Sequence, residues 1–217
     1  MHKKTIAVFG GSGRTGIPFL KLVLEQYNVK ALVRNPSKID FTHPGLEIIQ
    51  GDILSEPDVK KTIHSSFAVV SLIGHVKGSP DDLQVKATRY ILAAMEESKV
   101  KRLISLTGGG VRDKAVDTPK LMDKLVVFAM KNLAGKDARK TLLDGIAHAQ
   151  IIRESDTQWT IVRAPMLTDD PAKNKILEGN VGQVKGFKLT REDLAAFILK
   201  TIENDSYIHT MPFVTNG

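Results

Sequence analysis

Cysteine is absent from the 217 residues of the chain. This absence excludes disulfides, thiolate nucleophiles and cysteine-ligated metals, and no other pattern in the sequence indicates a metal site. Long apolar runs are also missing, since no stretch reaches the roughly 20 residues that a membrane-spanning helix needs. The apolar part of the N-terminal segment is short and ends in a glycine-rich turn, which is not the pattern of a signal peptide. We therefore expect a cytoplasmic protein that has no membrane partner.

Aromatic residues are scarce, at 6% of the chain, with three tyrosines and one tryptophan. The net charge is +7, which raises the question of a nucleic-acid partner. However, the lysines are scattered, and no aromatic platform accompanies them. We expect a solvated basic surface that also suits an anionic cofactor, and we do not expect nucleic-acid binding.

Glycine is concentrated in the segment TIAVFGGSGRTG, residues 5–16. A short apolar run precedes the glycines, and a run with helical spacing follows them. The glycines are Gly10, Gly11, Gly13 and Gly16. In a strand–turn–helix unit of this kind, the N–H groups and the dipole at the helix start attract a phosphate, and glycines let the backbone approach a pyrophosphate closely. The motif predicts dinucleotide binding; the alternative is a glycine-rich turn before a surface helix.

Strand-like and helical runs alternate along the rest of the chain. Apolar runs typical of buried strands lie at 6–9, 29–33, 46–50, 67–72, 103–106 and 159–162. Helical spacing is found at 17–24, 57–64, 81–98, 119–133, 138–155 and 191–203. Thr190 is a plausible N-cap for the last helix. The repeated β-α-β order predicts an α/β fold with a doubly wound parallel sheet, Rossmann-like, with residues 1–217 in a single domain.

The residues after the second predicted strand indicate which nucleotide binds. In folds that bind NAD, an acidic side chain at this place takes the ribose 2′-hydroxyl. Here the position carries Arg34, with Lys38 close by, and Arg14 lies in the glycine turn. A guanidinium binds a 2′-phosphate that a carboxylate would repel, so we expect NADP(H). The alternative is that these are exposed basic residues of a loop.

Asp52 follows the third predicted strand and is followed by Ile53. At this place in such folds an aspartate commonly meets the adenine amino group, and the next apolar residue packs on the ring. The alternative is that Asp52 only caps a helix or a turn.

Seven segments together resemble the atypical short-chain dehydrogenases/reductases, nearest the NmrA-like and the biliverdin reductase B (flavin reductase)-like proteins. The segments are IAVFGGSGRTG, ALVRNPSK, QGDIL, SLIGH, the helix at 87–95, KRLISLTGGG and IIRESDTQWTIVRAPMLTD. The resemblance implies that one set of residues holds the nucleotide from its phosphates to its nicotinamide. This set is Gly10, Ser12, Gly13, Arg14, Thr15, Gly16, Arg34, Lys38, Asp52, Ile53, Leu72, Ile73, Gly74, Thr107 and Pro165.

The Tyr-x-x-x-Lys dyad of the classical members of this superfamily is missing. Four positions after each of Tyr27, Tyr90 and Tyr207 stands an alanine or a methionine. Ketone reduction with a proton from tyrosine is therefore disfavoured. Hydride transfer to a flavin or quinone remains compatible with the sequence, because water can supply the proton and positioning does most of the work. Gly108, Gly145 and Met166 replace polar residues of biliverdin reductase B, so biliverdin reduction in particular is not implied.

Several residues are candidates for the substrate side. Thr107 ends a central predicted strand and is the candidate catalytic residue, although it could simply end the strand. The substrate candidates are His75, Met122, Phe128, His148 and Met166. By elimination we expect residues 111–140 to form a lid-like segment, whose apolar stripe roofs a flat pocket or else belongs to the core. For His148 the alternative is a packing role within its helix.

The pairs Asp113 and Asp117, and Asp169 and Asp170, lie in loop-like sequence, where solvation explains them. Two functions fit these observations. The first is an NADPH-dependent reductase of a flat conjugated small molecule, such as a flavin or quinone. The second is an NmrA-like sensor that binds NADP(H) and changes partners with redox state, without turnover. The sequence indicates no oligomeric state.

Overall fold

The computed structural model describes residues 3–76 and 78–217. Its main sheet has eight strands in the order β3-β2-β1-β4-β5-β6-β10-β8. All neighbouring strands are parallel except β8, which runs antiparallel to β10 at the edge. The strands are β1 (Thr5–Phe9), β2 (Asn28–Val33), β3 (Leu46–Gln50), β4 (Ala68–Ser71), β5 (Arg102–Gly108), β6 (Gln158–Ala164), β8 (Leu177–Gly179) and β10 (Phe213–Thr215).

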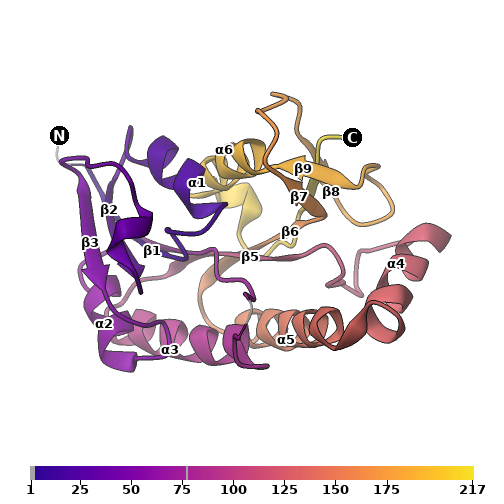
Figure 1. Ribbon diagram of the computed structural model, residues 1–217, viewed down its shortest axis with the longest axis horizontal. Coiled ribbons are helices and arrows are strands. Elements are labelled where there is room, and N and C mark those ends of the chain that lie inside the picture. The colour runs from indigo at the N-terminus through magenta and orange to yellow at the C-terminus, as the bar shows by residue number, and fades with distance from the viewer. Residues whose placement is uncertain (1–2, 77) are drawn as a thin grey trace.

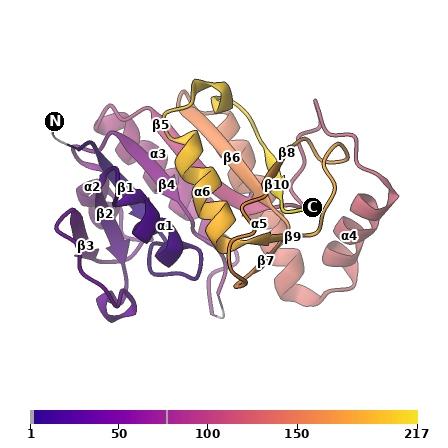
Figure 2. The ribbon, with the colours of Figure 1, turned by 90° about the horizontal axis from the view of Figure 1, so that it is seen from above.

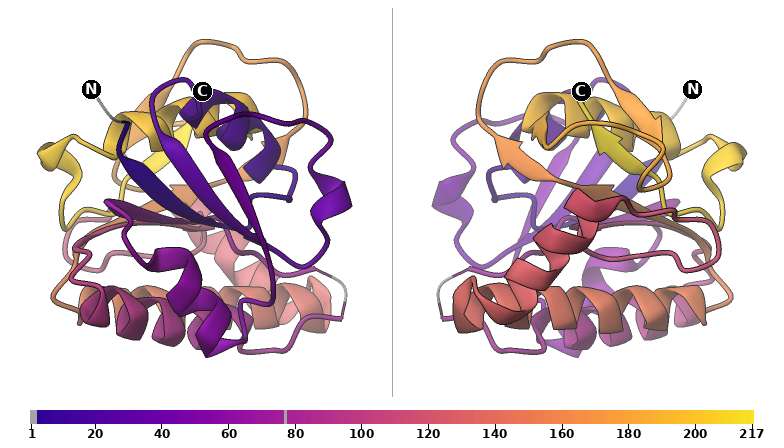
Figure 3. Two further views of the ribbon diagram at one scale, coloured as in Figure 1. Left: turned by 90° about the vertical axis from the view of Figure 1, so that its left-hand side faces the viewer. Right: turned by 90° about the vertical axis from the view of Figure 1, so that its right-hand side faces the viewer.

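Helices cover both faces of the sheet, as a doubly wound fold requires (Figure 1, Figure 3). On one face lie α1 (Gly16–Val23) and α6 (Arg191–Thr201). On the other face lie α2 (Glu56–Ile63), α3 (Leu83–Glu97) and α5 (Gly135–Arg153). Thr190 caps α6, because its side chain accepts a hydrogen bond from the Asp193 N–H at 3.1 Å, as predicted.

Burial on both faces explains the continuous apolar strands. Successive side chains of a strand point to opposite faces. In β1, Ile6 and Val8 join the core under α1 and α6, whereas Ala7 and Phe9 join the core under α2, α3 and α5. All four side chains are fully buried. A strand of this kind has no polar position, so its sequence reads as an uninterrupted apolar run.

β7 (Met166–Thr168), β9 (Lys188–Thr190) and α4 (Leu121–Asn132) lie near the end of the sheet that carries β8 and β10 (Figure 2). β7 and β9 form a separate parallel pair. α4 packs on α5 and projects away from the sheet (Figure 1, Figure 2). Two 3-10 turns complete the structure, η1 (Pro36–Lys38) and η2 (Asp205–Tyr207). Among the described residues, no helix has the length and apolar character that crossing a bilayer requires.

The predicted fold class is confirmed, and each predicted strand and helix is present. β7, β8, β9 and β10 were not predicted. Each has only three residues, which is too short for a periodic apolar pattern to stand out.

Candidate cofactor and substrate cleft

A cleft opens at the carboxyl ends of the strands, where the strand order reverses. β1 lies between β2 and β4. After β1 the chain forms β2 and β3 on one side of it, and the chain then crosses over to form β4 on the other side. Loops diverge at such a point and leave room for a ligand. The cleft has a volume of about 500 Å³. It is lined by all of the predicted cofactor-binding residues, which are Gly10, Ser12, Gly13, Arg14, Thr15, Gly16, Arg34, Lys38, Asp52, Ile53, Leu72, Ile73, Gly74, Thr107 and Pro165.

The glycine loop forms a narrow backbone cradle at the start of α1. Gly10 has φ +80°, and a Cβ there would lie 2.8 Å from the Leu72 carbonyl oxygen. A Cβ on Gly16 would overlap the carbonyl oxygens of Gly10 and Gly11. A side chain is therefore excluded at Gly10 by backbone conformation and space, and at Gly16 by space alone. Within the described residues no side chain caps α1, and although the Ile17 N–H donates to the Gly13 carbonyl at 3.0 Å, the Gly16 N–H at the start of the helix makes no such backbone hydrogen bond, so the loop fits a pyrophosphate.

Basic side chains surround the phosphate end of the cleft. Arg34 directly follows β2, and both Arg34 and Lys38 are exposed. Arg14 is also exposed, with Nη1 3.4 Å from Asp169 Oδ2. Arg191, the first residue of α6, lines the cleft with Nη1 2.7 Å from Asp169 Oδ1. Sequence analysis missed Arg191, although its place at the start of a predicted helix puts it at this edge of the sheet.

Asp52 forms a turn and also faces the cleft. Its Oδ1 accepts a hydrogen bond from the Leu54 N–H at 2.9 Å, and its own N–H donates to Asp58 Oδ2 at 3.0 Å. The turn role considered from the sequence is therefore present. It does not compete with the adenine role, since Asp52 and Ile53 both line the cleft.

Thr107 is in β5, three strands along the sheet from β2, which Arg34 and Lys38 follow. The residue is only 4% exposed, and its Oγ1 has no hydrogen-bond partner among the described residues. A Cβ on Gly145 of α5 would lie 3.0 Å from that oxygen. Gln84, at the start of α3, lines the same wall and donates from Nε2 to the Ile73 carbonyl at 3.0 Å. A buried hydroxyl without a partner costs free energy, so Thr107 is suited to a ligand or water contact.

The two candidate histidines lie in different environments. His75 lines the cleft, and its Nε2 is 2.7 Å from Asp144 Oδ2. His148 is only 2% exposed between α3 and α5, with Nδ1 2.9 Å from Thr88 Oγ1. Burial lowers the pKa of His148 to about 4, although the charge of Asp144 opposes the shift. His148 is therefore a neutral packing residue, and the structure does not bring it to the cleft as we had expected.

Three substrate candidates lie outside the cleft lining. Met122, Phe128 and Met166 are 54%, 57% and 58% exposed. Side chains alternate in the extended segment that leads into β7, so Pro165 and Leu167 line the cleft while Met166 does not.

The expectation that Met122 and Phe128 contact the substrate is wrong in a similar way. Both lie on other faces of α4, and Met130 of the same helix lines the cleft. No residue of α4 is buried, so its apolar stripe is not core.

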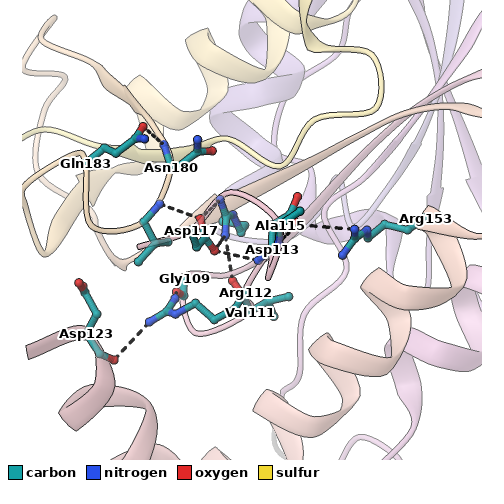
Figure 4. A network of polar contacts seen from close by, with 12 residues as sticks. Gly109, Val111, Arg112, Asp113, Ala115, Asp117, Asp123, Arg153, Asn180 and Gln183 are labelled. Atoms are coloured by element: carbon teal, nitrogen blue, oxygen red, sulfur yellow. Dashed lines mark hydrogen bonds and ion pairs between the residues drawn. The ribbon is translucent and has the colours of Figure 1, made fainter. Parts of the chain in front are cut away.

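The expectation that Asp117 is a solvated loop residue is wrong. Its side chain is 2% exposed and forms a salt bridge with Arg163, which is fully buried in β6. The two contacts, Nη1–Oδ2 and Nη2–Oδ1, measure 2.5 and 3.0 Å. Asp117 also accepts hydrogen bonds from the N–H groups of Asp113 and Val181 (Figure 4). Asp117 thus anchors the loop that leads from β5 to α4.

The fold resembles those of several solved oxidoreductases. The oxidoreductase ylbE from Lactococcus lactis has a TM-score of 0.80 and 19% identity, over 98% of this chain and 91% of that chain. A wide-type short-chain dehydrogenase/reductase from Veillonella parvula, in complex with NADP, has a TM-score of 0.76 and 18% identity, over 98% of this chain and 94% of that chain. ChuY, an anaerobillin reductase from Escherichia coli, has a TM-score of 0.77 and 19% identity, over 98% of this chain and 97% of that chain.

A family model described as NAD(P)H-binding matches residues 10–205. The match begins in the glycine loop and extends past Arg191, so it includes every segment that lines the cleft. These observations agree with a dinucleotide site at the reversal of strand order, and the chain belongs to the NAD(P)H-binding family.

Proposed function

We propose that the protein is an NADPH-dependent reductase that transfers hydride to a flat conjugated small molecule such as a flavin or quinone. The observation that carries the proposal is the continuity of the cleft. One cavity joins a backbone cradle and basic side chains at one end to Thr107 and apolar side chains at the other. We propose the cytoplasm as its compartment and a small molecule as its partner.

The proposed preference for NADPH rests on charge. Arg34 and Lys38 follow β2 at the place where NAD-binding folds carry an acid, and Arg14 of the glycine loop lines the same cleft. Several cations at one end of a cleft suit a 2′-phosphate, which guanidinium groups bind with two parallel hydrogen bonds. The similar structure from Veillonella parvula holds NADP, which supports this choice.

The acceptor end is suited to binding and orienting a flat molecule. The apolar side chains there are Leu83, Val111, Met130, Leu142 and Leu167. The nucleotide supplies hydride when bound. The chain would then hold the acceptor against it and exclude water, with Thr107 as a hydrogen-bonding group. Within the described residues no tyrosine lines the cleft.

The test is NADPH oxidation against a panel of flavins, quinones and tetrapyrroles. We expect one class of acceptor to be reduced with one NADPH consumed per two electrons delivered, and NADH to react more slowly. Reactions without protein are the control. The reductase proposal fails if no acceptor oxidises NADPH faster than that control.

The exposed apolar side chains of α4 favour a second candidate, a sensor that exchanges a protein partner with redox state. Leu121, Met122 and Phe128 are 74%, 54% and 57% exposed on this helix. Such a surface is typical of interaction sites. A sensor would bind NADPH and NADP⁺ with different affinities and show no turnover with any acceptor, so the same panel separates the two functions.

A further inference from the structure

His75 contacts a buried carboxylate directly behind the cleft wall. The imidazole lines the cleft with its side chain 14% exposed. Its Nε2 lies 2.7 Å from Oδ2 of Asp144 on α5, whose side chain is only 1% exposed. Among the described residues, Nδ1 of His75 makes no hydrogen bond. One nitrogen is therefore held from behind, and the other is left for a ligand.

Asp144 is fixed in place by the start of α3. Its Oδ2 accepts from the Gln84 N–H at 2.7 Å, and its Oδ1 accepts from the Val85 N–H at 3.1 Å. The N-cap residue of α3, Asp82, makes no side-chain cap of its own, so a residue of α5 supplies the cap. These two N–H groups hold both carboxylate oxygens of Asp144 in place at the start of the helix. A fixed carboxylate orients the imidazole that it contacts.

The same wall of the cleft carries Thr107. The place that a Cβ of Gly145 would take is 3.0 Å from Thr107 Oγ1 and 3.6 Å from Gln84 Oε1. Gly145 follows Asp144 in α5, and Gln84 is itself bound to Asp144 through its N–H. His75, Gln84 and Thr107 thus all line the cleft, and Asp144 and Gly145 of α5 lie behind them.

We propose that His75 is the proton donor of the reductase, with Asp144 as its positioning residue. The inference rests on the proposed function and fills the role that a tyrosine has in classical short-chain dehydrogenases/reductases. The nucleotide, when bound, would supply two electrons and one hydrogen to the acceptor as hydride. The Nδ1–H bond of the His75 imidazolium breaks, since Nε2 is held by Asp144, and the proton goes to the acceptor heteroatom that gains negative charge. The imidazole is left neutral, and solvent water returns a proton to it after the reduced acceptor has left the cleft.

The kinetic test compares His75→Gln with the wild type on the best acceptor of the panel. General acid catalysis contributes about 100-fold or more, so we expect kcat to fall by about 100-fold. NADPH affinity by calorimetry, acceptor affinity and melting temperature should stay close to wild type. Added imidazole should restore activity to His75→Ala. Asp144→Asn should lower kcat without such rescue. His64→Gln, at the exposed end of α2, is the matched control and should be unchanged.

A chemical test that needs no turnover measures contact with the acceptor. Diethyl pyrocarbonate modifies accessible histidines, and mass spectrometry maps the sites. We expect NADP⁺ plus acceptor to slow modification of His75 at least fivefold and to leave His64 unaffected. Equal modification of His75 with and without ligands would overturn the proposal.

The outcomes separate this inference from the proposed function. If no acceptor is reduced, both fall. If turnover is found and His75→Gln retains more than half of kcat, only the proton-donor role falls. If His75→Gln loses rate, stability and NADPH affinity together, and imidazole does not rescue His75→Ala, the His75–Asp144 contact is structural and the proposal is wrong.

Discussion

Arg34 directly follows β2 and lines the basic end of the cleft. Because it would bind the 2′-phosphate that distinguishes the two nucleotides, Arg34→Ala should weaken NADP⁺ binding by about 10- to 100-fold, as expected for loss of a charge-assisted hydrogen bond of about 1.5–3 kcal/mol. NAD⁺ affinity should change by less than about twofold. Calorimetric titration of both nucleotides measures the difference.

Arg89→Ala provides the matched control, because Arg89 is an exposed arginine of α3 outside the cleft lining. It should alter neither affinity. An equal loss for both nucleotides in Arg34→Ala would mean that Arg34 does not contact the 2′-phosphate.

Burial of His148 makes stability depend on pH. Its pKa in the folded protein is about 4, below the ordinary value of 6.5. The folded state therefore favours the neutral ring. The stabilisation is complete above pH 6.5 and is lost as pH falls through 4, because the unfolded chain takes up the proton first. The shift corresponds to about 3 kcal/mol.

His148→Gln should abolish this dependence. We expect the difference in unfolding free energy between wild type and variant to shrink by about 3 kcal/mol between pH 7 and pH 4. Urea unfolding at several pH values measures it, and comparison of the two proteins cancels the titration of the carboxylates. A difference that is constant with pH would contradict the assignment.

At the scale of elements, α4 presents one side to the cleft and another to solvent. Met130 lines the cleft, while Met122 on the same helix does not. Met130→Ala should weaken acceptor binding by about 5- to 30-fold, since truncating a buried apolar contact costs roughly 1–2 kcal/mol. Met122→Ala should leave acceptor binding within about twofold. Acceptor KM and NADP⁺ affinity on both variants provide the measurement.

Equal effects of the two methionine substitutions would mean that α4 does not contact the acceptor through its inner side. A fall in NADP⁺ affinity for Met130→Ala would instead indicate a general disturbance of the cleft. Residues 111–140 remain a predicted lid, with Met130 rather than Met122 or Phe128 as the contact from α4.

At the scale of the whole molecule, the cleft exists only when the sheet is assembled. Its lining comes from loops that follow β1, β2, β3, β4, β5 and β6. A nucleotide therefore binds the folded state alone and stabilises it by mass action, by about 2.7 kcal/mol at 100 times Kd. For a chain of this size the melting temperature should rise by roughly 5–10 °C.

NADP⁺ should raise the melting temperature more than NAD⁺ at the same concentration, as scanning calorimetry or fluorimetry would show. In Arg34→Ala the two shifts should become similar. If NADP⁺ and NAD⁺ raised the melting temperature of the wild type equally, the result would contradict the preference for NADP.

The phosphate end of the cleft was predictable from short segments of sequence. A strand that is buried on both faces reads as a continuous apolar run, as in residues 6–9, and the residues just after each such run must lie at one edge of a parallel sheet. Position relative to a strand is then enough to bring Gly10, Arg34 and Asp52 together. The two glycine positions follow from local backbone geometry, since Gly10 has a positive φ and Gly16 has no room for a side chain.

The acceptor end depends on tertiary contacts that local patterns do not encode. His75 and Asp144 are 69 positions apart, and Arg163 and Asp117 are 46 apart. Each pair forms because helices and loops pack at particular distances across the sheet. Likewise, the apolar stripe of α4 was recognisable, but its docking on α5 decided that Met130 and not Phe128 reaches the cleft. Sequence by itself therefore determined the sheet, the glycine cradle and the basic residues beside it, because these follow from periodicity and backbone conformation. Only the tertiary structure decided which side chains line the far end, because that depends on which faces of separate elements meet.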